Sequence, residues 1–194
     1  GSVSLWADYI YLDTDERRRF AQVSHEYLIE QVQRQEFTIT SVNDTLDINL
    51  NHPVKEMIWT TRNEGSSGRN GPSNDGAADT DPTASVVSLD EMQGTWQLKL
   101  NGQDRFKERD TRYFTRTQVW EHHTGYGGTI RPDNIAVYSF ALKPEEHQPS
   151  GTCNFSRIDN AQLVLSAADA LYIYAVNYNV LRIMSGMGGL AYSN

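Results

Sequence analysis

The chain has 194 residues, with 17 basic and 25 acidic side chains and a formal net charge of −8. This length is sufficient for one substantial hydrophobic core, and an acidic chain binds nucleic acid poorly unless its basic residues cluster. A single cysteine, Cys153, excludes an internal disulfide and any zinc site built from several cysteines. The longest apolar run, Leu171 to Val176, is far shorter than the ~20 residues of a membrane-spanning helix. The chain starts with Gly1-Ser2 and no initiator methionine, so we expect it to be a piece of a longer protein.

The first predicted elements are a strand and a helix. Leu5 to Leu12 is extended and apolar, which is typical of a strand. Asp13 to Glu16 supplies an N-cap and acidic side chains for the first turn of a helix. Apolar side chains then recur at helical spacing, namely Phe20, Val23, Tyr27, Leu28 and Val32. The sequence therefore predicts a helix here, with Arg17 to Arg19 on its solvated face rather than in a phosphate site.

Four segments in the next part of the chain have the alternating pattern of strands. They are Phe37–Ser41, Thr45–Leu50, Val54–Thr61 and Thr95–Leu100. Residues 63–85 interrupt them and are rich in Gly, Ser, Asn, Asp and Pro, without large apolar side chains. Such a segment buries too little apolar area to offset the entropy of ordering it. We therefore expect 63–85 to be a long, exposed and flexible loop within one domain.

The segment from Asp104 to Trp120 mixes basic and aromatic side chains. Its basic residues are Arg105, Lys107, Arg109, Arg112 and Arg116, and its rings are Phe106, Tyr113, Phe114 and Trp120. Such a mixture can bind single-stranded nucleic acid by stacking. Because Asp104, Glu108 and Asp110 reduce the positive charge, we favour a short amphipathic helix and loop with its rings in the core.

Three more strands are predicted at Tyr138–Leu142, Thr152–Ile158 and Ala161–Leu165. Pro144 and Pro149 end the first of them, because proline removes a ladder donor and fixes φ. The connections are short, so the sequence predicts an antiparallel meander.

The longest segment typical of a strand is Ala170–Met184, in which Asn177 and Asn179 share one face. About eight short strands with turn signals between them, and one capped helix near the start, predict an all-β fold. The expected architecture is an eight-stranded antiparallel β-sandwich with a short N-terminal helix and one long flexible loop.

Motifs for catalysis or cofactors are weak in this sequence. Gly186 to Ala191 fits the G-x-G-x-x-A dinucleotide pattern, but a phosphate-binding helix and an acidic residue about 20 positions later must follow, and the chain ends too soon. His122 and His123 are adjacent, whereas two helical metal ligands need i, i+4 spacing, so we expect a structural or surface role. Cys153 is expected to be a buried, inert thiol. The sequence therefore predicts no enzyme activity, no catalytic residue, no cofactor and no metal site.

Two sequons for N-glycosylation are present, beginning at Asn43 and Asn154. Because Asn154 lies in a predicted strand, Asn43 is the candidate acceptor.

The stretch "SFALKPEEHQPSGTCNFSRIDNAQL" (139–163) resembles the C-terminal half of the major capsid proteins of large icosahedral double-stranded DNA viruses, the iridovirus, phycodnavirus and mimivirus group. The resemblance continues in "LDTDERRRFAQVSHEYLIEQ" (12–31), "LNHPVKEMIWT" (50–60), "LKLNGQDRF" (98–106) and "NYNVLRIMSGMGGLAYSN" (177–194). These stretches are long and occur in the family's order, and none of them includes residues from 63–85.

The resemblance implies a structural protein with a jelly-roll fold of two packed sheets. Members of the family carry two jelly rolls, so residues 1–35 are expected to be the end of the first with a helical connector, and 36–194 the second. Family subunits form homotrimers, the pseudo-hexagonal capsomers, which contact neighbouring capsomers and minor capsid proteins in an icosahedral shell. In the family, the shell lies over an inner membrane, and the capsid protein neither inserts into this membrane nor contacts nucleic acid directly. The resemblance also implies that the protein is located in the virion capsid and assembles in the host cytoplasm.

An alternative function is carbohydrate binding, since jelly rolls also occur in lectins. Such a module needs exposed aromatic rings beside polar groups on one face or rim. The candidate rings are Tyr126, Tyr172 and Tyr174.

Overall fold

The computed structural model describes residues 3–39, 44–62, 92, 94–125, 135–166 and 170–192. The chain divides into two compact units, Gly1–Ile29 with Asn179–Asn194, and Glu30–Tyr178. The predicted loop 63–85 lies outside the described residues, so its expected exposure stays a prediction.

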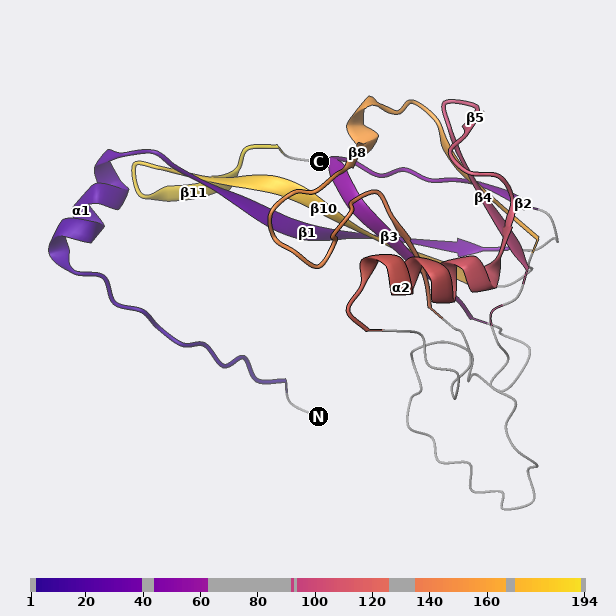
Figure 1. Ribbon diagram of the computed structural model, residues 1–194. Helices are drawn as coiled ribbons and strands as arrows, with labels where there is room; N and C mark the ends of the chain where they lie inside the picture. The colour runs from indigo at the N-terminus through magenta and orange to yellow at the C-terminus, as the bar shows by residue number, and fades with distance from the viewer. Residues whose placement is uncertain are drawn as a thin grey trace, which may run out of the picture. The chain divides into compact units, whose positions relative to one another are not determined.

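One sheet is organised around two long strands. Its main path runs β1 (His25–Thr38), β10 (Ala170–Met184), β3 (Pro53–Arg62) and β7 (Ala136–Ser139) (Figure 1). Two short strands extend it: β11 (Met187–Leu190) pairs with β10, and β8 (Cys153–Asn154) pairs with β3. β10 and β3 run antiparallel, with Ile173 opposite Trp59. Their register shifts between Val176 and Asn177, so Lys55 is the extra residue of a β-bulge.

The second sheet consists of shorter strands, all from the Glu30–Tyr178 unit. Its order is β2 (Asp44–Asp47), β9 (Ala161–Leu165), β4 (Thr95–Leu100) and β5 (Gln103–Asp104), and β6 (Arg109–Asp110) also pairs with β4. Buried and half-buried side chains alternate along β9, which gives this sheet one face for the core.

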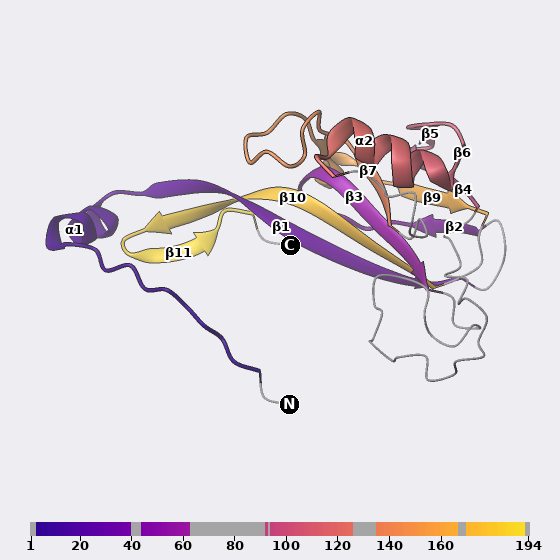
Figure 2. The same ribbon diagram turned by 60° about the horizontal axis from the view of Figure 1, so that its bottom comes forward.

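The hydrophobic core is formed by buried side chains from both sheets within the Glu30–Tyr178 unit. Figure 2 shows the strands that carry these side chains. At its centre the Trp59 ring lies 5.6 Å from the Trp96 ring and 5.0 Å from the Phe114 ring, measured between centroids. Phe114 comes from a π-helical turn (Tyr113–Thr117) that continues into α2 (Gln118–His122), and both lie against β7. The expected all-β sandwich with a shared core is therefore confirmed.

The remaining helical turns are short. α1 (Thr14–Gln22) begins as expected, because the side chain of Asp13 accepts a hydrogen bond of 2.7 Å from the backbone N–H of Asp15. A 3₁₀ turn (Phe155–Arg157) follows β8 and is capped in the same way by Asn154.

Two predictions for the N-terminal region were wrong. The helix ends at Gln22, and Tyr27, Leu28 and Val32 lie in strand β1. The reason is tertiary, because β1 pairs with β10 along the sheet edge and such pairing overrides a weak local helical preference. Residues 5–12 form no strand, and the side chains of Leu5 and Trp6 are almost fully exposed.

The predicted meander was also wrong. β7 and β8 both pair with β3, whereas β9 lies in the other sheet between β2 and β4. The predicted strand Thr152–Ile158 shortens to the two residues of β8, because Phe155 starts the 3₁₀ turn and is buried in the core. The connections from β7 to β8 and from β8 to β9 therefore join strands that are not neighbours in a sheet.

Replacing Gly151 with alanine is expected to lower the free energy of unfolding by about 1–3 kcal/mol. Gly151 has φ of +150°, and a Cβ there would lie 2.7 Å from the carbonyl oxygen of Phe140. Gly125→Ala is the matched control, because its Cβ would meet no atom within 4 Å. Urea unfolding of both variants gives the comparison, and equal losses would contradict the assignment of strain to Gly151.

Candidate functional site

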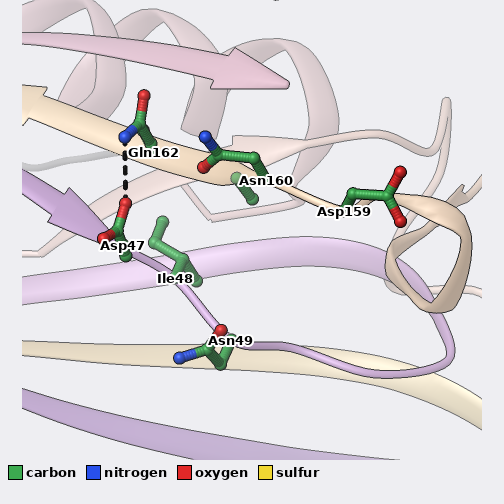
Figure 3. Close-up of a pocket in the computed structure, with 7 residues that line it drawn as sticks. Asp47, Ile48, Asn49, Asp159, Asn160 and Gln162 are labelled. Carbon is green, nitrogen blue, oxygen red and sulfur yellow. Dashed lines mark hydrogen bonds between the residues drawn. The ribbon is translucent and has the colours of Figure 1, made fainter. Parts of the chain in front are cut away.

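A polar pocket opens where β2 ends and β9 begins (Figure 3). It has a volume of about 420 Å³ and is lined by Asp47, Ile48, Asn49, Asp159, Asn160, Ala161 and Gln162. The amide nitrogen of Gln162 donates a hydrogen bond of 2.9 Å to Oδ1 of Asp47, which ties the two strands together at the pocket wall. The lining offers the carboxylates of Asp47 and Asp159 and the amide groups of Asn49, Asn160 and Gln162, so it can bind water or hydroxyl groups by hydrogen bonds.

A second polar site is a charge cluster, formed by Glu30, Lys55, Glu56, His123, Glu145 and His147. The β-bulge places Lys55 and Glu56 in succession at the start of β3, where both side chains are nearly buried. Nζ of Lys55 lies 2.7 Å from Oε1 of Glu30 on β1 and 5.6 Å from the centre of the Tyr178 ring. This ammonium group is thus neutralised by one carboxylate and lies over an aromatic face.

His123 links two carboxylates in this charge cluster. Its Nε2 lies 3.1 Å from Oε2 of Glu56, and its Nδ1 lies 3.3 Å from Oε1 of Glu145. His123 is positioned by the C-terminal end of α2, whose last turn it caps through its backbone N–H. The next residue, Thr124, donates its backbone N–H to both carboxylate oxygens of Glu145 at 3.1 Å.

The pKa values of the two carboxyl groups move in opposite directions. Burial raises the pKa of Glu56, and the positive charges of His123 and Lys55 oppose that rise only in part. The hydrogen bonds from Thr124 lower the pKa of Glu145, which is exposed to solvent. The cluster therefore contains one carboxyl that gains a proton readily and one that resists it.

The sequence-predicted site residues fall in several places. Asn43 and Tyr126 lie outside the described residues, so glycosylation at Asn43 stays a prediction. Tyr172 and Tyr174 are half-buried on β10, and the guanidinium of Arg34 lies 5.1 Å from the centre of the Tyr172 ring. That cation partly covers the ring, and nothing in this arrangement favours carbohydrate binding over packing.

The glycine-rich motif, Cys153 and His122, which are weak indications of chemistry in the sequence, have structural roles. Gly186 lies in the turn between β10 and β11, so the glycine-rich motif belongs to a β-hairpin rather than to a strand and helix. Cys153 is half-buried, and burial raises the pKa of its thiol, which makes the nucleophilic thiolate scarcer. His122 contacts the carbonyl oxygen of Leu142 through Nδ1 at 3.1 Å.

In the basic and aromatic segment 104–120, the prediction that the rings pack in the core is confirmed for three of the four rings and is wrong for Trp120. Phe106, Tyr113 and Phe114 pack in or against the core, while Trp120 is 76% exposed. The guanidinium of Arg109 lies 4.6 Å from the centre of the Tyr113 ring, so this cation is already engaged within the chain. Among the described residues, no group of three or more His, Cys, Asp or Glu side chains is arranged to hold a metal ion.

Exposed apolar side chains gather in the Gly1–Ile29 and Asn179–Asn194 unit. Those of the N-terminal segment, residues 3–12, are Val3, Leu5, Trp6, Tyr9, Ile10, Tyr11 and Leu12. Met184, Met187 and Leu190 of the β10–β11 hairpin are also exposed. Apolar surface of this extent marks contact regions in soluble proteins. No helix in the described part of the chain has the length and apolar character to cross a membrane.

Comparison with known proteins decides the family. Residues 16–189 match the family described as the large eukaryotic DNA virus major capsid protein. The chain belongs to this family. It is 49% identical to the major capsid protein of Pyramimonas orientalis virus and 41% identical to that of Paramecium bursaria Chlorella virus 1, with all of this chain aligned in both.

Solved structures give the same relationship. A chain of the PBCV-1 virus capsid superposes with a TM-score of 0.74 at 39% identity, and 96% of the present chain is covered. The fold is therefore the jelly roll expected from the resemblance. This chain spans about half the length of its relatives, 49% and 54% of the two viral proteins and 56% of the PBCV-1 capsid chain.

The charge cluster was missed at the level of sequence. The sequence feature that indicated it was the adjacent pair Lys55-Glu56 among the apolar residues of a predicted strand. Two neighbouring charges are rarely buried in a strand without partners. The partners Glu30, His123 and Glu145 come from separate parts of the chain, and only the fold brings them together.

Proposed function

We propose that this chain is the C-terminal jelly roll of a major capsid protein subunit, and that its role is structural rather than catalytic. The observation that carries the proposal is the 39% identity and TM-score of 0.74 with a chain of the PBCV-1 virus capsid over 96% of the present chain. The two viral relatives are both named major capsid protein, and each aligns with all of this chain. Burial of apolar area between subunits supplies the driving force for such a role.

The proposed assembly is a homotrimer that forms a pseudo-hexagonal capsomer. Capsomers contact one another and minor capsid proteins in an icosahedral shell, which lies over an inner membrane without insertion. The protein is then located in the virion capsid after assembly in the host cytoplasm, with no direct contact to nucleic acid. The acidic net charge of −8 supports the last point, because phosphate contacts come from clustered cations.

The proposed domain organisation assigns residues 1–35 to the end of a preceding jelly roll and its helical connector, and 36–194 to the C-terminal jelly roll. Strand β1 (His25–Thr38) crosses this boundary, because it pairs with β10 in the sheet of the C-terminal jelly roll. The exposed N-terminal segment, residues 3–12, supports this assignment. Most of its side chains are apolar, and Trp6 and Ile10 are about nine-tenths exposed. A strand of a preceding sheet would have this composition and would bury these side chains against its own domain.

Light scattering of the chain across a concentration series tests the assembly. One copy has a mass of 22.0 kDa, and we expect the mass to rise towards about three times this value as concentration increases. The chain with Trp6→Ser and Ile10→Ser is the matched control. It lacks two exposed apolar side chains that could cause unspecific association, and a specific trimer persists in it. A mass of 22.0 kDa at every concentration would contradict trimer contacts within this half of the subunit.

A further inference from the structure

The segment between β7 and β8, residues 140–152, forms a closed loop, called here the β7–β8 loop. The backbone N–H of Lys143 donates to Oγ of Ser150 at 2.9 Å, and this hydroxyl donates in turn to the carbonyl oxygen of Lys143. Pro144 in the middle of the loop is fully buried. At its start, the N–H groups of Phe140 and Ala141 donate to the carbonyl oxygen of Lys55 in the bulge. The loop is thus folded onto the sheet at both its base and its centre.

Ionisable side chains hold the rest of the β7–β8 loop against its surroundings. From the loop, Glu145 contacts His123 and Thr124 at the end of α2. Nδ1 of His147 lies 3.5 Å from Oε1 of Glu30 on β1. Both ion-pair contacts between the loop and the rest of the unit therefore pair a histidine with a carboxylate. The histidine lies outside the loop in the first pair and on the loop in the second.

The protonation of His123 is constrained by geometry. A neutral imidazole carries one N–H, so it can donate to only one of two acceptors. Both ring nitrogens of His123 face carboxylate oxygens, at 3.1 Å from Glu56 and 3.3 Å from Glu145. Nε2 of His123 and Oε2 of Glu56 are buried. Although the two atoms lie close to each other, neither makes a hydrogen bond with acceptable angles. When the imidazole is neutral and both carboxyl groups are ionised, one N–H faces two acceptors, so one of the two contacts has no donor.

The surrounding charges favour that proton. Apart from the histidines, the charge cluster contains three carboxylates and one ammonium group. The titratable groups that face His123 and His147 come from every element packed against the loop. They are Glu30 of β1, Lys55 and Glu56 of β3, Tyr178 of β10, His122 and His123 at the end of α2, and Glu145 and His147 of the loop. Lys143 and Glu146 pair with each other at the solvent side. With both His123 and His147 neutral the charge cluster is negative, and with both protonated its charges balance.

We propose that the β7–β8 loop is a proton-operated clasp, which closes more firmly on β1, β3 and α2 when His123 and His147 are protonated and loosens when they are neutral. Opening the loop removes Glu145 from His123 and His147 from Glu30, so the imidazolium forms lose their partners. The contacts of Glu145 with His123 and of His147 with Glu30 exist in the closed loop alone, so the closed loop gains stability as pH falls.

Two carboxyl groups modify this trend in opposite directions. The raised pKa of Glu56 means that its protonation also favours the closed form as pH falls. The lowered pKa of Glu145 means that its contribution is present above the ordinary carboxyl range and is lost as pH falls through its own pKa. Protection is therefore expected to pass through a maximum at mildly acidic pH and to fall again in strong acid. This clasp does not depend on the proposed capsid role.

Hydrogen exchange of the intact chain, followed by mass spectrometry of peptides from 140–152 and corrected for intrinsic exchange rates, tests the clasp. We expect protection at pH 5.5 to exceed that at pH 7.5 by about fivefold, because the two ion pairs are partly exposed and each contributes little by itself. The double variant with His123→Gln and His147→Gln should lose this pH dependence.

The matched control is His122→Gln. His122 lies beside His123 on α2 but contacts only the carbonyl oxygen of Leu142, which a neutral imidazole satisfies. This variant should lower protection equally at both pH values and keep the same ratio between them. Equal protection of the unaltered chain at pH 5.5 and 7.5 would overturn the clasp, and so would a pH dependence that persists in the double variant.

Discussion

Replacing Trp59 with alanine is expected to lower the free energy of unfolding by about 3–5 kcal/mol, the range for large aromatic side chains removed from a core. Trp59 is 1% exposed and packs against Trp96 of the opposite sheet and Phe114 of the π-helical turn. Its loss would remove the contact that joins three elements and leave a cavity between them. Urea unfolding followed by circular dichroism measures the change, with the slope checked for constancy.

Trp120→Ala is the matched control for this prediction. Its side chain is 76% exposed on α2, so the same chemical change should alter stability by no more than about 0.5 kcal/mol. Comparable losses for the two tryptophans would show that Trp59 does not anchor the core. A third variant, Trp59→Phe, should lose less than Trp59→Ala, because it keeps a ring and also removes the buried indole N–H that has no hydrogen-bond partner.

Strands with strong alternation were predictable from the sequence. β9 and β4 occupy the expected residues, and β10 runs from Ala170 to Met184 as predicted. Their apolar side chains recur with period 2 on a face buried by the other sheet, so the local pattern and the tertiary environment agree. The N-cap at Asp13 was equally predictable, since its hydrogen bond is made to the nearby Asp15.

β1 could not be predicted in the same way. Its inner face carries glutamines, and Gln33 and Gln35 bind the backbone of Asn51 and Asn49 through their amide groups. These partners lie far away in sequence, so the polar inner face conceals the alternation of a strand. The apolar residues that remain visible, such as Tyr27 and Val32, happen to fit helical spacing as well.

The function could be inferred only from the family resemblance and not from the chemistry of individual residues. The sequence pattern predicted a β-sandwich without an arrangement of catalytic residues, and proteins with this fold serve many unrelated functions. The charge cluster shows the same limit, because a β-bulge at Lys55 turns two successive side chains towards partners on β1 and α2. Neither the bulge nor the partners are encoded in the local pattern of β3.

Replacing Glu30 with glutamine is expected to lower the free energy of unfolding by about 1–3 kcal/mol, because it leaves the buried ammonium group of Lys55 without its carboxylate. The side chain of Lys55 is 4% exposed and that of Glu30 is 33% exposed, so the loss should be smaller than for a fully buried pair. Urea unfolding followed by circular dichroism measures the loss.

Glu26→Gln is the matched control on the same strand. Glu26 lies 2.6 Å from Nη2 of Arg182, but about half of each side chain is exposed, so its loss should cost no more than about 1 kcal/mol and less at high salt. Adding Lys55→Met to Glu30→Gln should restore most of the stability, because an apolar side chain of similar size needs no counter-charge. If the double variant is no more stable than Glu30→Gln alone, the cost does not come from an unpaired charge at Lys55, and the clasp's fixed charges need a different account.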